Sequence, residues 1–131
     1  MIVNCFEADL DIFENLNESS KLEIIYKGDT LFISNDKEKI HEFVVFLSTA
    51  EYIESEKFTK PYYSLNFYDE KNKKIGYMRI LLNRLSFNKK YYCLSQNIED
   101  KLYQIFHFDY DIYQKLKFKG TGTEDFINKC N

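Results

Sequence analysis

Four short apolar segments follow one another between residues 63 and 94, and polar turns separate them. In the first segment, Tyr63, Leu65 and Phe67 alternate with polar neighbours, which is the pattern of a strand with one buried face. The second segment is apolar enough to lie centrally in a sheet. The region therefore predicts an antiparallel meander. Its four expected strands cover residues 63–68, 75–82, 85–87 and 91–94.

An earlier block of the chain has the same strand-like character. Two apolar segments, 22–27 and 30–33, flank Gly28-Asp29, and this predicts a hairpin because glycine takes a positive φ at little cost. Apolar residues then recur at helical spacing, which predicts a helix over about 36–50 with Asn35 as its N-cap.

A further helix is expected after the meander, with Ser95 or Asn97 as its cap and an apolar stripe that begins at Ile98. Helices do not alternate with single strands, so a parallel doubly wound sheet is not expected. We predict an α+β fold in which an antiparallel sheet of two hairpin-like blocks has helices packed mainly on one face. At 131 residues the chain fits one domain, 1–131, which we expect to be a monomer or a weak dimer.

Composition and the cysteine pattern bear on where the protein works. Hydrophobic residues make up 44% of the chain, yet no apolar run reaches the length of a membrane span. The N-terminus lacks the basic and apolar regions of a signal peptide, which predicts a cytoplasmic protein. Cys5, Cys93 and Cys130 are odd in number and far apart, so we expect three reduced thiols rather than a disulfide framework.

Three sequence features could carry chemistry, and each has a structural interpretation. His107, Asp109 and Asp111 would share one face and hold a metal ion only on a strand, whereas their surroundings have a helical pattern. The Gly-Thr-Gly-Thr run at 120–123 lacks the spacing of a phosphate-binding loop and fits a helix end followed by a new cap. His41 lies one position off the apolar stripe of its predicted helix. We therefore expect no enzyme activity, no cofactor and no bound metal.

Charge is distributed unevenly along the chain. The first 56 residues hold thirteen acids and four bases, and residues 57–90 hold nine bases and two acids. Phe6, Leu10 and Phe13 share one side of a predicted short helix whose other side is acidic. Such a helix could present a negative surface to a basic protein partner. The residues expected to bind this partner are Glu7, Asp9, Asp11 and Glu14.

The basic centre of the chain suggests an alternative function. Between residues 57 and 92, tyrosines and phenylalanines are interleaved with lysines and arginines, and a sheet with such side chains can stack single-stranded nucleic acid. Most of these lysines fall in predicted turns, where charge is expected in any case, and the net charge of the chain is −3. We therefore do not expect tight binding to nucleic acid. The alternative is a single-stranded nucleic-acid-binding or phage anti-defence module.

In size, acidic balance, composition rich in Lys, Asn and Ile, and lack of a catalytic motif, the chain resembles the small immunity proteins of contact-dependent growth inhibition and related polymorphic toxin systems. The resemblance implies a bacterial, cytoplasmic inhibitor. Its partner would be a cognate toxin domain, often a nuclease, blocked by occlusion of its active site. The resemblance implies no site residues, because these immunity proteins differ in fold.

Overall fold

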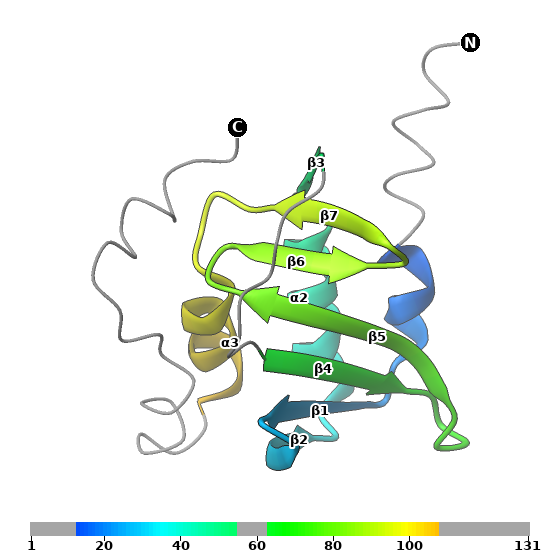
Figure 1. Ribbon diagram of the computed structural model, residues 1–131. Helices are drawn as coiled ribbons and strands as arrows, with labels where there is room; N and C mark the ends of the chain where they lie inside the picture. Colours follow the sequence, from blue (N-terminus) through cyan, green and yellow to red (C-terminus); the bar gives the residue numbers. More distant parts are fainter. Residues whose placement is uncertain (1–12, 55–62, 108–131) are drawn as a thin grey trace, which may run out of the picture.

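The computed structural model describes residues 13–54 and 63–107, and these form one seven-stranded antiparallel sheet with helices (Figure 1). The strand order is β2-β1-β4-β5-β6-β7-β3, so the two hairpin-like blocks join where β1 pairs with β4. The strands are β1 (Lys21–Tyr26), β2 (Asp29–Ser34), β3 (Glu51–Ile53), β4 (Tyr63–Tyr68), β5 (Lys74–Leu81), β6 (Arg84–Phe87) and β7 (Lys90–Cys93). The predicted α+β fold is confirmed.

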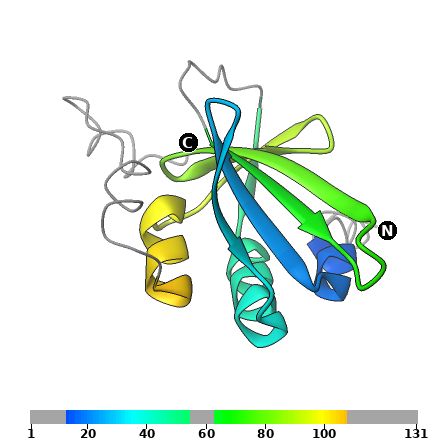
Figure 2. The same ribbon diagram turned by 90° about the horizontal axis from the view of Figure 1, so that it is seen from below.

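Among the described residues, the helices all pack on one face of the sheet (Figure 2). They are the 3-10 helix η1 (Asn15–Glu18) and the α-helices α2 (Lys37–Leu47) and α3 (Ile98–Phe106). The other face of the sheet carries no helix in this part of the chain. The predicted arrangement, with the helices mainly on one face, is therefore also confirmed.

Strand periodicity decides which side chains enter the core. Ile24, Leu65 and Met78 lie opposite one another on β1, β4 and β5, and all three are fully buried under the helices. Their sequence neighbours point to the other face, as the two-residue period of a strand requires. Burial and the nearby Glu99 carboxylate raise the pKa of Tyr63, which stacks on Tyr26 with ring centroids 4.6 Å apart. The core thus lies between the sheet and the helices.

Helix α2 has the predicted apolar stripe, with Ile40, Phe43 and Leu47 buried. Its N-cap is Asp36, whose carboxylate accepts a hydrogen bond from the N–H of Lys39. The prediction of Asn35 as the cap was therefore wrong by one residue. The helix connects β2 to β3, which are the opposite edges of the sheet, and it runs behind the strands and across them (Figure 1).

Helix α3 is tied to the turn between β5 and β6. Asn97 is the N-cap and accepts hydrogen bonds from the N–H groups of the next turn, so one of the two predicted caps is confirmed. The buried carboxylate of Glu99 accepts a hydrogen bond from the N–H of Leu82, and the Ile98 N–H donates to the Leu82 carbonyl. Leu82 has a φ of 60°, a conformation in which both of its backbone groups reach the helix.

Candidate partner-binding site

Helix η1 is held to the sheet by two apolar side chains. Phe13 stacks on Phe87 with ring centroids 5.4 Å apart and meets the edge of Tyr92 at 5.2 Å. Leu16 is also buried, with 1% of its surface exposed. With these side chains directed inward, Glu14 and Glu18 are exposed. The described part of the predicted acidic helix therefore does present carboxylates to solvent.

A glycine in β5 lets η1 approach the sheet closely. Gly76 pairs with Phe67 of β4, and the Leu16 side chain occupies the space above it. A Cβ atom at Gly76 would collide with Cδ2 of Leu16. The absence of a side chain at Gly76 therefore leaves the space into which Leu16 of η1 packs.

The β4–β5 turn lies beside the residues that follow η1. The Asp69 carboxylate Oδ1 accepts hydrogen bonds from the N–H groups of Lys71 and Lys73, each at 2.9 Å. The Ser20 N–H donates to the Tyr68 carbonyl at 2.8 Å. These bonds fix the turn next to Ser20 and so bring together segments about fifty residues apart in the sequence.

The first residue of α2 forms the third side of this region. Lys37 makes an ion pair with Glu70 of the β4–β5 turn. Both side chains are more than half exposed, so the pair contributes little to stability. The pair nevertheless shows that the turn lies beside the start of α2.

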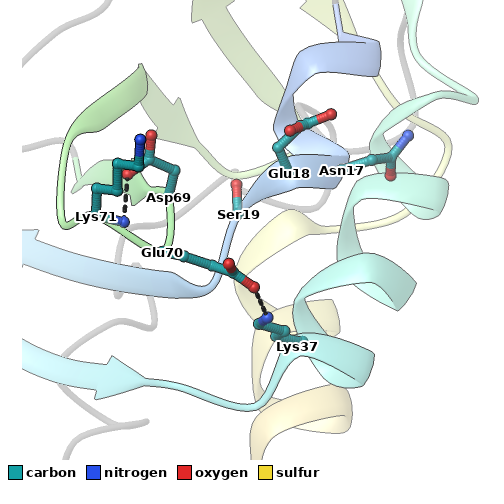
Figure 3. A pocket seen from close by; sticks show the side chains of 7 residues that line it. All are labelled: Asn17, Glu18, Ser19, Lys37, Asp69, Glu70 and Lys71. Atoms are coloured by element: carbon teal, nitrogen blue, oxygen red, sulfur yellow. Dashed lines mark hydrogen bonds and ion pairs between the residues drawn. The ribbon is translucent and has the colours of Figure 1, made fainter.

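A polar hollow of about 520 Å³ lies between these three elements (Figure 3). Ser19 is only 4% exposed, and its hydroxyl has no hydrogen-bond partner among the residues that the structure describes. The hydroxyl points toward the space between η1 and the turn (Figure 3). A buried hydroxyl without a partner costs about 1–3 kcal/mol. The lining residues are Asn17, Glu18, Ser19, Lys37, Asp69, Glu70 and Lys71.

This hollow, the η1 hollow, carries charges of both signs with an excess of carboxylates. Three carboxylates and two ammonium groups line it, and Lys37 and Glu70 neutralise each other. Two carboxylates then face one ammonium, that of Lys71. Within residues 13–54 and 63–107, no group of three or more His, Cys, Asp or Glu side chains could hold a metal ion.

A second, shallower hollow of about 270 Å³ lies on the helix-free face. The Arg79 guanidinium donates to the Ser86 hydroxyl at 3.4 Å, and the Tyr77 hydroxyl lies 3.2 Å from that of Ser64. Asn88 and Lys89 both have positive φ in the two-residue β6–β7 turn, as a tight hairpin requires. The lining residues are Tyr77, Arg79, Ser86, Asn88 and Lys89.

The predicted partner-binding residues are only partly described. Glu14 is exposed at the N-cap of η1 and does not line the η1 hollow. Glu7, Asp9 and Asp11 lie outside the described residues. The lining residues were missed because polar side chains in turns carry no periodic signal. Their meeting depends on pairing between distant strands.

The aromatic residues of the basic centre divide between the two faces of the sheet. Four of them are buried in the core and cannot stack a ligand: Tyr63, Phe67, Phe87 and Tyr92. Tyr77, by contrast, is 45% exposed beside the second hollow. Residues 57–62 and 108–131 lie outside the described residues. The second range includes Asp109, Asp111 and the run at 120–123.

His41 is exposed on α2, and His107 is the left-handed C-cap of α3, with a φ of 50°. One cysteine prediction is wrong: Cys93 is disulfide-bonded, and the other two cysteines lie outside the described residues. Sequence spacing could not show this, because the fold decides which cysteines meet. The cysteine pattern therefore no longer supports a cytoplasmic location, which stays a prediction.

In comparisons with known proteins, no protein-family model, curated protein or solved structure matches the chain. In the described part of the chain, every helix is too short or too polar to cross a bilayer.

Proposed function

We propose that this protein binds and inhibits a protein partner, namely a toxin domain encoded beside it. The observation that carries the proposal is the position of η1, which leaves Glu14 and Glu18 exposed and contributes Glu18 to a polar hollow with an excess of carboxylates. Residues 13–54 hold nine acids and four bases, so this part of the chain has a net negative charge. A nuclease cleft is built to hold phosphates and is positive, which makes the two surfaces complementary.

In this mechanism the inhibitor covers the toxin active site and does no chemistry of its own. The acids of η1 accelerate encounter with a basic cleft, and aromatic contacts slow dissociation. Tyr52 is 55% exposed and contacts Tyr92, which Phe13 also contacts, so it offers rigid contact area with a polar tip near η1. The resemblance to polymorphic-toxin immunity proteins supports the same partner class.

Co-expression with the product of the neighbouring gene tests this function. We expect that product to be toxic alone and harmless in the presence of this protein. The double variant Glu14→Lys/Glu18→Lys should weaken the complex at least about tenfold, mostly through a slower association rate, and should do so less at high salt. The matched control Glu38→Lys/Glu42→Lys makes the same charge change at two exposed positions of α2 and should change the affinity by less than about threefold.

Two results would contradict the proposal. One is a neighbouring product that is not toxic, and the other is a product that stays toxic when this protein is in excess. Circular dichroism of each variant shows whether it is folded, so that a loss of protection is not assigned to a loss of structure.

A second candidate function, single-stranded nucleic-acid binding, is favoured by the hollow around Tyr77, Arg79 and Lys89. Under this alternative, a gel shift with a single-stranded oligonucleotide gives sub-micromolar affinity at physiological salt. That affinity falls in the variant Lys89→Glu/Lys90→Glu and falls steeply with salt. Under the inhibitor proposal we expect no such shift.

A further inference from the structure

We infer that the η1 hollow receives an arginine side chain from the protein partner. This inference rests on the proposed function for the identity of the partner. The binding of a guanidinium group can nevertheless be measured without that partner. The argument depends on hydrogen-bond acceptors, on charge and on the size of the hollow.

The wall formed by residues 17–19 supplies several different acceptors. Asn17 carries an amide oxygen, Glu18 a carboxylate and Ser19 a hydroxyl, and all three line the hollow (Figure 3). A guanidinium group presents five N–H donors in one plane, so it can serve several acceptors at once. The lysine ammonium is a point charge on a flexible stem and matches such a spread of acceptors less well.

The buried hydroxyl of Ser19 points to a ligand that donates hydrogen bonds. Ser19 is 96% buried and has no partner among the described residues, and its hydroxyl is directed toward the hollow. A guanidinium N–H inserted there would satisfy it. At about 520 Å³, the hollow has room for the head of a long side chain.

The charges of the lining argue against an anion. The N-terminus of α2 is already capped by Asp36, so its N–H groups do not form an open anion site. Lys37 is held by Glu70, and Asp69 accepts hydrogen bonds from its own turn. The remaining charges are the Lys71 ammonium, which belongs to the β4–β5 turn, and the Glu18 carboxylate. Glu18 is the one placed to attract a cation, because it stands on the same wall as Ser19 (Figure 3).

NMR titration of the full chain with Nα-acetyl-L-arginine amide tests the inference. We expect saturable shifts of backbone amide signals confined to residues 17–19 and 69–71. The citrulline analogue has the same shape without the charge and should bind at least about tenfold more weakly. The lysine analogue should also bind more weakly than arginine.

Two variants assign the binding to this hollow. Glu18→Gln should weaken arginine binding at least about fivefold, and Ser19→Ala should weaken it to a smaller degree. Glu42→Gln removes an exposed carboxylate from α2 and should leave the binding unchanged. Dispersed amide spectra of each variant establish that it is folded.

The inference is overturned if arginine causes no saturable shift, if the shifts lie elsewhere, or if citrulline or lysine binds equally well. Such a result leaves the proposed function intact when Glu14→Lys/Glu18→Lys still abolishes protection from the toxin. Conversely, specific arginine binding without any protection would reject the immunity function and keep the site.

Discussion

A single carboxylate on the helix-free face connects three neighbouring strands. Glu23 of β1 accepts hydrogen bonds from Thr30 of β2 and from Asn66 and Tyr68 of β4. The hydrogen bond from Thr30 is the main cause that lowers the pKa of Glu23 below its ordinary value of 4.5. Burial acts in the opposite direction, and the other hydrogen bonds and Lys21 add to the lowering.

Because the pKa of Glu23 is lower in the folded state than in the unfolded state, ionised Glu23 stabilises the fold above pH 4.5. This contribution is lost as the pH falls through the folded-state pKa. Glu23→Gln should therefore lower the free energy of unfolding by about 1 kcal/mol at pH 7 and reduce the acid dependence of stability. Urea unfolding at several pH values between 7 and 3 measures both effects.

Thr30→Val keeps a β-branched residue in β2 and removes the donor. It should shift stability in the same direction as Glu23→Gln, by a smaller amount. If the stabilities of the wild type and of Glu23→Gln depend on pH in the same way, the ionisation of Glu23 does not contribute to the acid dependence of stability.

At the scale of elements, Gly76 determines how closely η1 approaches β5. Glycine inside a strand usually weakens it, so alanine would be stabilising there if space allowed. Since the Cβ atom would collide with Leu16, we expect Gly76→Ala to lower the free energy of unfolding by about 1–3 kcal/mol. Urea denaturation measures this loss, and amide exchange of residues 15–18 reports the displacement of η1.

A double-mutant cycle with Leu16→Ala is the control for this contact. The cost of Gly76→Ala should largely disappear once the Leu16 side chain is shortened, because the two changes act on one contact. If the two losses in the free energy of unfolding are additive, Gly76→Ala acts through the backbone rather than through the contact with Leu16.

Periodicity explains which elements could be predicted. The stripe of Ile40, Phe43 and Leu47 located α2, and the alternation around Leu65 located β4. Strand β3 was missed because its three residues are too few to show a period. The cap of α2 was misplaced because Asn35 and Asp36 have similar capping chemistry, and only backbone geometry distinguishes them.

At the scale of the whole molecule, the strand order could not be predicted from the sequence pattern. The candidate site depends on this strand order. β1 pairs with β4, so the chain after η1 meets the β4–β5 turn. The β4–β5 turn, with two acids and two lysines, and the β6–β7 turn, with Lys89, consequently lie at the same end of the sheet as acidic η1 (Figure 1). Glu14 could be predicted as a site residue from its charge alone. Ser19 could not, because its role depends on a buried hydroxyl that has no hydrogen-bond partner among the described residues.

The position of α2 also bears on the width of the sheet. Six gaps between seven strands span about 29 Å at about 4.8 Å each. The eleven residues of α2 cover about 16 Å, and the two linkers to β2 and β3 add at most about 25 Å over their seven Cα–Cα steps. The connection can therefore reach from one edge strand to the other. Because α2 alone covers more than half of that width, this helix is the element that lets so short a connection join the opposite edges of a seven-stranded sheet.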